Sequence, residues 1–203
     1  MDLVREFGHI DIYVFDQLLR GRIAPGMRIV DAGCGSGRNL VYFLRQGYDV
    51  RGVDADPHAI EEVRRLAAAE APHASPDRFV CEPIESMTVP AGSADVVLAS
   101  AVLHFARDDA HFDAMVDACW KALSPGGLFF ARLASSAGLA ETLRPVSSGR
   151  FVLPDGSTRY LVDEQRLTGR TAALGGELID PLKTTLVHGQ RSMTTWVVRK
   201  GGV

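Results

Sequence analysis

Three glycines within five positions, directly after an apolar run, constrain this chain more than any other feature of its sequence. The stretch is VDAGCGSGRNL, residues 30–40, with glycines at 33, 35 and 37. Ordering a glycine costs more backbone entropy than ordering any other residue, so such a cluster has to serve a purpose. A strand, a glycine-rich loop and a helix that begins near Arg38 would place bare backbone N–H groups at the carboxyl end of a sheet, where open α/β sheets bind ligands. The stretch therefore predicts a loop that admits a polar, adenosine-like ligand.

Apolar runs and helix-like segments alternate between residues 28 and 134, which is typical of a parallel sheet with helices on both faces. The predicted strands are 28–33, 48–54, 78–82, 94–102 and 128–134. The predicted helices are 38–47, one that begins with Asp56 and Pro57, and one capped by Asp108 or Asp109. A turn is expected at SPGG, 124–127, and no convincing helix fits the link 83–93.

The segments on either side of this alternating region follow other patterns. Before it, apolar residues at 3, 7, 10, 14 and 18 form a stripe that predicts one amphipathic N-terminal helix. After it, we expect two short strands around a PDGS turn in 148–163, a helix from Asp163 to about Ala173, and an antiparallel hairpin in 184–200. The 203 residues suit a single domain. We divide it into an N-terminal helix (1–24), a cofactor-binding core (27–134), and a substrate-side insertion with the terminal hairpin (135–203).

Charge and cysteine usage restrict the partners and the compartment. The formal net charge of −3 gives no electrostatic reason to expect nucleic acid or an anionic membrane as a partner. No apolar run approaches the roughly 20 residues that span a bilayer, and charged residues interrupt the N-terminus where a signal peptide needs an apolar centre. Cys34, Cys81 and Cys119 form no CxxC pair, which favours a reducing cytoplasm. Cys34 is interpreted as a small residue in a tight turn rather than as a nucleophile.

The spacing of the glycines narrows the ligand. A dinucleotide-binding loop has the pattern G-x-G-x-x-G, but Arg38 stands where the third glycine would be. Asp54 follows Gly33 by 21 residues and ends the second strand, where a carboxylate can accept hydrogen bonds from two ribose hydroxyls. The ligand is therefore expected to contain a ribose, without a need for phosphate.

Four stretches in this order resemble the class I S-adenosylmethionine-dependent methyltransferases: VDAGCGSGRNL, VRGVDADPHAI, VPAGSADVVLASAVLHF and ALSPGGLFFARL. The resemblance implies a Rossmann-like three-layer α/β sandwich with a mostly parallel seven-stranded sheet and a C-terminal antiparallel hairpin. GCGSGRN together with the terminal RSMTTWVVRK resembles most the subgroup related to the tellurite-resistance methyltransferases.

The same resemblance implies roles for individual residues. Gly33, Gly35 and Gly37 would pass under the methionine part of the cofactor, beside Cys34 and Asn39. Asp31 would orient the loop or bind the cofactor's ammonium group, Asp54 would hold the ribose, and Ala55 would lie against the adenine. Ser100 and Ala101, at the end of the fourth strand, would line the methionine end.

The adenine end departs from the family pattern. Pro83 stands where many members carry an acid that binds the adenine amino group, and Ile84 follows it. Glu82 or Glu85 would then take over this contact, or the adenine would be held by apolar contacts and backbone. We keep Glu82, Pro83 and Ile84 as candidate cofactor contacts.

Methyl transfer from a sulfonium is an in-line displacement in which the leaving group is already activated, so a catalytic base is optional. His104, after the fourth strand, is the candidate base, and the plainer interpretation is a packed or solvated strand-end residue. Arg132 and Tyr13 are candidate substrate contacts, with ordinary salt bridging and helix packing as the plainer interpretations. His104, Asp108 and His111 have helical spacing, but two histidines and an acid at a helix start are usually surface residues, so no metal site is expected.

The insertion 135–163 is small, which favours a small-molecule acceptor that takes the methyl group on O, N, S or a metalloid. The protein is expected to be a monomer or a homodimer. A nicotinamide-dependent oxidoreductase is disfavoured by Arg38 and by the lack of a second domain. Two further alternatives stay open: a non-catalytic adenosylmethionine-binding protein, and a methyltransferase that acts on protein or RNA.

Overall fold

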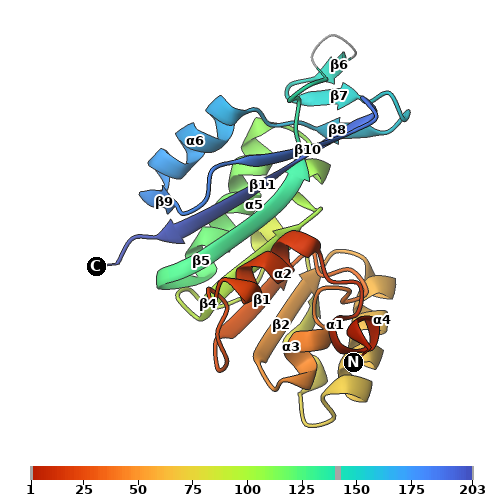
Figure 1. The fold of residues 1–203 in the computed structure, drawn as a ribbon, viewed down its shortest axis with the longest axis vertical. Coiled ribbons are helices and arrows are strands. Elements are labelled where there is room, and N and C mark those ends of the chain that lie inside the picture. Colours follow the sequence, from red (N-terminus) through yellow and green to blue (C-terminus); the bar gives the residue numbers. More distant parts are fainter. Residues whose placement is uncertain (1, 140–142, 203) are drawn as a thin grey trace.

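A mixed sheet forms the centre of the computed structural model, which describes residues 2–139 and 143–202 (Figure 1). Within these residues the sheet has eight strands in the order β10-β11-β5-β4-β1-β2-β3, and β9 pairs with the last residues of β11. Strands β1 to β5 are parallel to one another, and β11 runs antiparallel between β5 and β10. The bounds are β1 Arg28–Ala32, β2 Asp49–Asp54, β3 Phe79–Cys81, β4 Ala94–Ser100, β5 Leu123–Ala134, β9 Gly176–Leu178, β10 Lys183–Val187 and β11 Arg191–Lys200. The predicted Rossmann-like α/β fold with its terminal hairpin is confirmed, and the short β9 is an addition to the seven expected strands.

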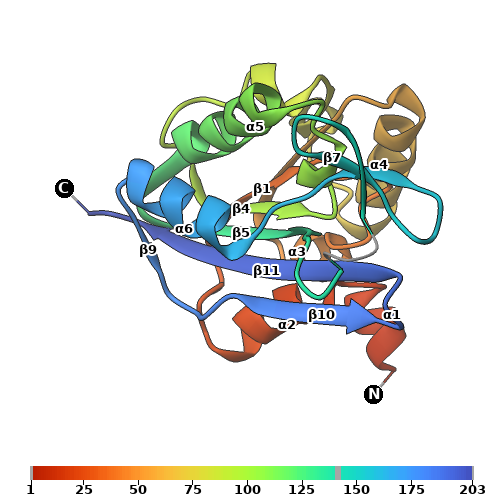
Figure 2. The same cartoon turned by 90° about the horizontal axis from the view of Figure 1, so that it is seen from above.

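Helices cover both faces of the sheet. One face carries α2 (Ile12–Leu19), α3 (Val41–Arg45) and α4 (Pro57–Glu70), and the other carries α5 (Asp109–Ala122) and α6 (Glu164–Ala173). Figure 2 shows α5 and α6 on the side of the sheet opposite to α2. Successive strand residues alternate between the two cores, which is why the central strands are apolar almost throughout. None of these helices, nor any other in the described residues, combines the length and apolarity that a bilayer crossing needs.

Aspartates start the three longest helices that follow the first strand, as their positions in the sequence predict. Each carboxylate accepts the backbone N–H of a residue two or three positions later, which satisfies a donor that the helix leaves unpaired. The pairs are Asp56 with His58 at 2.9 Å, Asp108 with His111 at 2.8 Å and Asp163 with Arg166 at 2.7 Å.

The prediction of one N-terminal helix is wrong, because two helices form there. Helix α1 (Leu3–Phe7) ends at Gly8, whose φ of +62° lies in the left-handed region. A Cβ at Gly8 would also lie 2.8 Å from Cγ2 of Val41, so the chain passes α3 more closely than another residue would allow. Asp11 then caps α2 by accepting the N–H of Tyr13 at 2.9 Å. The regular apolar spacing conceals this break, although α1 contributes no buried residue to the core.

Two boundaries in the central region also differ from the predictions. The helix expected to begin near Arg38 begins at Val41, after a series of turns, and has only five residues. The expected SPGG turn lies inside β5, where Ala94 pairs with Leu123 and Val96 with Leu128. Residues 124–127 are therefore an outward bulge in a longer strand rather than the connection before it.

A second, three-stranded antiparallel sheet lies beyond the carboxyl end of β5, at the top of Figure 1. It consists of β6 (Arg144–Ser147), β7 (Arg150–Val152) and β8 (Thr158–Tyr160), of which only β7 and β8 were predicted. Tyr160 attaches this sheet to α5: its ring stacks on Phe112 at a centroid distance of 5.0 Å, and its hydroxyl donates to Asp109 at 2.6 Å. The small sheet is thereby held over the edge of the main sheet where ligands are expected.

Candidate active site

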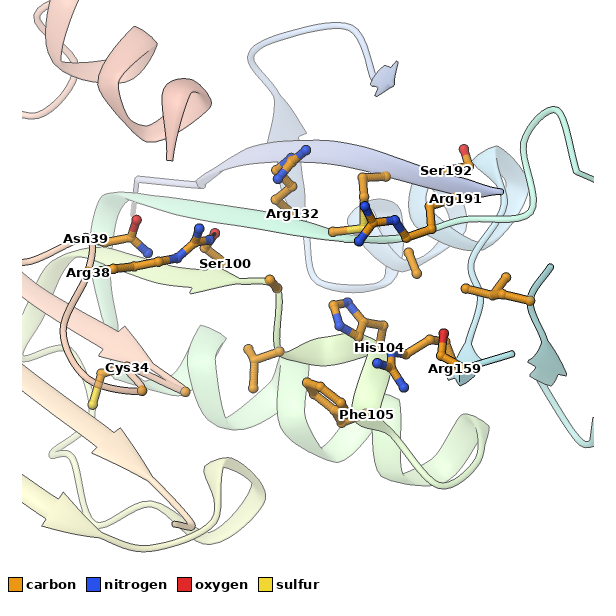
Figure 3. Close-up of a pocket in the computed structure, with 18 of the residues that line it drawn as sticks. Cys34, Arg38, Asn39, Ser100, His104, Phe105, Arg132, Arg159, Arg191 and Ser192 are labelled. Atoms are coloured by element: carbon orange, nitrogen blue, oxygen red, sulfur yellow. Dashed lines mark hydrogen bonds between the residues drawn. The ribbon is translucent and has the colours of Figure 1, made fainter. Parts of the chain in front are cut away.

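A cavity of about 830 Å³ opens at the carboxyl ends of β1, β4 and β5 (Figure 3). Its opposite wall comes from residues 153–159 of the small sheet and 187–193 of the terminal hairpin. Nine of the sequence-predicted site residues line it: Gly33, Cys34, Gly35, Asn39, Asp54, Ser100, Ala101, His104 and Arg132. The glycine loop therefore lies at a cavity, as its sequence predicted. Part of the wall of this cavity comes from the last third of the chain.

The three loop glycines have three different environments. A Cβ at Gly33 would lie 2.3 Å from Cγ2 of Val102, and one at Gly37 would lie 2.7 Å from Cδ2 of Leu66. These two glycines therefore serve the packing of the loop against its neighbours. A Cβ at Gly35 would meet nothing within 4 Å, and Gly35 lines the cavity. Gly35 is therefore the loop glycine whose Cβ position is left open to a ligand in the cavity.

Asp54 supports the loop from the end of β2. Its Oδ2 accepts the N–H of Gly35 at 2.9 Å, and its Oδ1 accepts the N–H of Asp56 at 2.9 Å. Each carboxylate oxygen has a second lone pair, so the group can still accept hydrogen bonds from a ligand. Cys34 beside it is buried, and this burial raises the pKa of the Cys34 thiol, which opposes a role as a nucleophile.

Asp31 lies behind the loop and is almost fully buried. Its Oδ2 has no hydrogen-bond partner among the residues that the structure describes. Burial raises the pKa of Asp31 to about 7, against the opposing effect of the positive charge of Arg38. A carboxylate in this state gains from any cationic group that enters the site.

Asp11 joins the N-terminal helices to the cavity, and the sequence analysis missed it. Its buried Oδ2 accepts hydrogen bonds from Ser100 Oγ at 3.1 Å and from Arg132 Nη1 at 3.2 Å, and lies 3.6 Å from Arg38 Nη2. Its backbone N–H donates to Oδ1 of Asn39 at 2.9 Å. The sequence indicates only that an aspartate before an apolar run can cap a helix, because the other partners lie 27 to 121 positions away.

Tyr13 stands outside the cavity, behind Arg132. The Arg132 guanidinium lies 5.4 Å from the centroid of the Tyr13 ring, and the Tyr13 hydroxyl is 2.7 Å from Oγ1 of Thr185. Stacking on the ring and pairing with Asp11 together hold Arg132 at the cavity wall. In this structure Tyr13 therefore supports Arg132 from behind.

The end of β4 carries backbone strain at the cavity. Ala101 has φ of +63°, a left-handed conformation that costs a non-glycine residue about 1 kcal/mol or more. Its N–H donates to the carbonyl of Arg132 at 2.7 Å, which holds the strained turn in place. Such strain is commonly concentrated at functional sites, and here it directs the chain toward His104.

His104 lines the cavity from the short 3-10 helix η3 (Leu103–Phe105) and is mostly buried. Burial lowers the pKa of His104 to about 4, and the positive charges of Arg159 and Arg132 act in the same direction. Its Nδ1 has no hydrogen-bond partner within the described part of the chain. The imidazole is therefore neutral at physiological pH and able to accept a proton.

The predicted adenine contacts lie outside this cavity. Ala55 is exposed, Pro83 begins the 3-10 turn η2 (Ile84–Ser86), and the Ile84 side chain packs in the core. The Glu82 carboxylate accepts the N–H of Thr88 at 2.8 Å. Glu85, the other acid considered for the adenine amino group, lies 2.9 Å from Nε2 of His111. The adenine contacts therefore stay predictions.

Two further arginines of the cavity were not predicted from the sequence. Arg159 comes from β8 and Arg191 from the start of β11, and in the view of Figure 3 Arg159 lies below His104 and Arg191 above it. Each stands in an unremarkable strand-like segment, so no local sequence signal could have identified them. Only the packing of the tail against β4 and β5 brings them to this wall.

Comparison with known proteins agrees with this geometry. Residues 30–131, half of the chain, match the model of the methyltransferase domain family. Over 118 residues the chain is 40% identical to a ubiquinone biosynthesis O-methyltransferase of Methylocella silvestris, a match that covers 56% of this chain and 44% of the relative. The chain spans about half the length of the curated relatives it matches.

Solved structures share the fold at low sequence identity. A SAM-dependent methyltransferase of Methanosarcina mazei is 19% identical, with a TM-score of 0.72 and coverage of 92% of this chain and 98% of that one. The 1,6-didemethyltoxoflavin-N1-methyltransferase of Burkholderia thailandensis, solved with 1,6-didemethyltoxoflavin and S-adenosylhomocysteine, is 20% identical, with a TM-score of 0.70 and coverage of 98% and 81%. These likenesses support the architecture, including the terminal hairpin.

Proposed function

We propose that this chain, which belongs to the methyltransferase domain family, transfers a methyl group from S-adenosylmethionine in line to an atom of a small molecule. The observation that carries the proposal is the loop at the end of β1. There, the open side of Gly35 faces the cavity beside Asp54, and an unpartnered carboxylate of Asp31 lies behind it.

The residues present fit this cofactor. Asp54 has acceptor capacity left for ribose hydroxyls after it has bound the Gly35 N–H. Asp31 can balance the positive charge of the methionine ammonium or sulfonium, which would lower its own pKa. Asn39 and Ser100 line the cavity close to the loop, in the positions proposed for the methionine end. Ala55, Glu82, Pro83 and Ile84 would form the adenine end.

When bound, the cofactor supplies an electrophilic methyl group on a sulfonium leaving group. The chain then has to align the acceptor, exclude competing water and remove a proton where the acceptor carries one. His104 is the proposed base, because its neutral imidazole lines the cavity. With a pKa near 4 it is a weak base, which suits an acceptor that loses its proton readily as the new bond forms.

The acceptor atom is proposed to be oxygen, nitrogen, sulfur or a metalloid. The curated relatives are named as O-methyltransferases, which favours oxygen. The likeness of GCGSGRN and RSMTTWVVRK to the tellurite-resistance subgroup keeps a metalloid acceptor as the second candidate. A small acceptor of either kind fits a cavity of about 830 Å³, which the cofactor also has to occupy.

The remaining parts of the proposal concern organisation and setting. Residues 27–134 would bind the cofactor and residues 135–203 would bind the acceptor, with no nucleic acid or membrane involved, in a monomer or homodimer. A cytoplasmic location is supported by Cys34, Cys81 and Cys119, all of which are free thiols.

Calorimetric titration with S-adenosylhomocysteine, the expected product, tests the proposal most directly. The wild type should bind it, and Asp54→Ala should weaken binding at least tenfold, because both the ribose acceptor and the anchor of the Gly35 loop are removed. Asp56→Ala is the matched control, since Asp56 caps α4 from an exposed position two residues away. Its affinity should stay within about twofold of the wild type.

The same titration distinguishes the alternatives. Absence of binding to S-adenosylmethionine and to S-adenosylhomocysteine would overturn the proposed function. Binding without conversion of S-adenosylmethionine in the presence of phenol, amine, thiol and tellurite acceptors would favour a non-catalytic binding protein. Label uptake from methyl-labelled cofactor into the protein or RNA fraction of a cell extract would favour a macromolecular acceptor.

A further inference from the structure

Arginines in this protein fall into two groups according to their partners. Several lie within 3 Å of a carboxylate and hold elements together. The pairs are Arg22 with Asp180 at 2.6 Å, Arg28 with Asp95 at 2.6 Å, Arg45 with Glu70 at 2.5 Å and Arg166 with Asp113 at 2.9 Å. Each of these four arginines therefore has a structural role, because its ion pair holds two parts of the fold together. Arg159 and Arg191, in the cavity wall, belong to the other group.

Arg159 forms no ion pair within the described ranges 2–139 and 143–202. Its Nη1 donates to the carbonyl of Thr158 at 2.8 Å, and its guanidinium lies 4.9 Å from the centroid of the Phe105 ring. Thr158 is its neighbour in the chain and Phe105 lines the same cavity, so the positive charge stays at the cavity wall, where it acts on the carboxylate of Asp155 without forming an ion pair with it.

Arg191 has only a distant carboxylate partner. Its Nε is 3.9 Å from Oδ2 of Asp155, beyond hydrogen-bond distance, and its side chain is 62% exposed. The other oxygen of Asp155 is occupied by Ser157, whose N–H and hydroxyl donate to it at 3.0 and 2.6 Å. Asp155 therefore compensates the charge of Arg191 only weakly.

The guanidinium groups of Arg159 and Arg191 line the same cavity. Positive charge from Arg159 and Arg132 reaches His104, as the direction of its lowered pKa shows. Nε of Arg132 is buried without a hydrogen-bond partner in the described chain. This end of the cavity is positive although the protein as a whole carries a formal charge of −3. A cavity with surplus cationic donors favours an anionic ligand.

Apolar side chains also line this part of the cavity. Leu153, Val187 and Met193 line the cavity from the small sheet and the hairpin, next to Ala134 at the end of β5. A purely inorganic ion would leave these surfaces without a partner, whereas an organic ligand with an apolar body would cover them.

We infer that Arg159 and Arg191 form an anion-binding subsite that takes the carboxylate or phosphate group of an organic acceptor, with its apolar body against Leu153 and Met193. The inference rests on the proposed function for the identity of the ligand as the methyl acceptor. The planar guanidinium group matches either anion with two parallel hydrogen bonds. Arg38 and Arg132 lie 3.6 and 3.2 Å from the Asp11 carboxylate, which leaves Arg159 and Arg191 for the acceptor.

Binding of simple probes tests this inference without turnover. Naphthalene-2-carboxylate and 2-naphthyl phosphate are titrated against neutral naphthalene-2-carboxamide and against inorganic sulfate, with and without saturating S-adenosylhomocysteine. We expect at least one of the two anions to bind about tenfold or more tightly than the carboxamide and the sulfate. Arg159→Gln and Arg191→Gln should each lower its affinity about fivefold, and the double variant should abolish the preference over the carboxamide.

Matched controls replace exposed arginines on the same elements. Arg199→Gln lies on β11 with Arg191, and Arg144→Gln lies on β6 of the sheet that holds Arg159. Both should retain the wild-type preference and the wild-type affinity for S-adenosylhomocysteine.

The remaining outcomes overturn either the inference or the proposed function. Equal affinity for the anions and the carboxamide would show that the arginines recognise no charge. Equal affinity for sulfate and for the naphthyl anions would show that the site does not recognise the apolar body of an organic ligand. Loss of S-adenosylhomocysteine affinity in Arg159→Gln or Arg191→Gln would assign these residues to the cofactor. If S-adenosylhomocysteine binds normally while the anions fail, the inference fails and the proposed function stands; if the anions bind and S-adenosylhomocysteine does not, only the proposed function fails.

Discussion

The two ends of the cavity differ in charge and in the part of the chain that forms them. At the end formed by the loop after β1, Asp54 and bare backbone line the cavity, and the buried Asp31 lies behind them. The end formed by the tail presents arginines, Arg159 and Arg191, between apolar side chains. One cavity therefore offers a region for a cationic nucleoside and a region for an anionic acceptor. Opposite charges in the two regions would bring a cationic methyl donor and an anionic acceptor together with each in its own place.

Asp11 stands between the two regions. Its buried carboxylate carries one negative charge between Arg132 at 3.2 Å and Arg38 at 3.6 Å, and so ties both arginines to the N-terminal helices. The N-terminal helices are attached to the cavity at this point. The predictions below test the two regions separately, starting with the largest expected effect.

Alanine substitutions in the glycine loop should separate packing from ligand access. Gly33→Ala should destabilise the fold by about 2–5 kcal/mol, because the new Cβ meets Val102 and φ is +76°. Gly35→Ala should cost only about 1–2 kcal/mol, from its φ of +52°, but should weaken binding of S-adenosylhomocysteine. Urea unfolding and calorimetry measure the two effects. Equal stability losses in both variants would contradict the assignment of different roles.

Removal of the Asp11 carboxylate should cost more than the loss of a helix cap. Asp11→Ala leaves Arg132 and Ser100 without their partner, and we expect a loss of about 2–3 kcal/mol in the free energy of unfolding. Asp2→Ala is the control, since Asp2 caps α1 from an exposed position by accepting the N–H of Arg5, and it should cost about 1 kcal/mol or less. Similar losses of stability for the two substitutions would show that Asp11 acts only as a helix cap and does not attach the N-terminal helices to the cavity.

His104 should make the fold less stable in acid. Its pKa is lower in the folded protein than in the unfolded chain, so the unfolded chain binds the proton first as the pH falls. The contribution of the neutral imidazole is therefore complete above about pH 6.5 and is lost toward pH 4, a change of about 2 kcal/mol between pH 8 and pH 5. His104→Asn should lack this component when the two unfolding curves are subtracted. The subtraction is needed because Asp31, whose pKa is raised, acts in the opposite direction.

Cofactor affinity should depend on the ionisation of Asp31. With a pKa of about 7 in the free protein, Asp31 is mostly protonated at pH 6, and binding of the cationic S-adenosylhomocysteine ammonium then has to expel the proton. We expect an affinity up to about tenfold lower at pH 6 than at pH 8. Asp31→Asn should bind weakly and without this slope, whereas His104→Asn should keep it. A flat profile in the wild type would show that Asp31 does not sense the ligand.

Local sequence patterns predicted the cavity end formed by the loop after β1 well, and the end formed by the tail hardly at all. The loop at 33–37, the caps at Asp56, Asp108 and Asp163 and the apolar strands depend on neighbours within a few residues, and the structure forms them where expected. The break between the two N-terminal helices could be predicted only in part. Gly8 and Asp11 can be recognised in the sequence as helix-ending and helix-capping residues. The close approach of Gly8 to Val41, which requires the break, cannot be predicted from the sequence.

The sequence by itself determined the alternation of strands and helices and the position of the glycine loop, because backbone propensity and hydrophobic periodicity act over short stretches of chain. It also indicated Asp54, because the spacing from the loop to the end of the next strand is set by one helix. Only the tertiary structure decided that Asp11 would pair with Arg132 and that Arg159 and Arg191 would share a wall with His104. These residues are 121, 55 and 87 positions from their partners, counted respectively from 11 to 132, 104 to 159 and 104 to 191. Their meeting depends on how the small sheet and the hairpin pack against the main sheet, which no local pattern encodes.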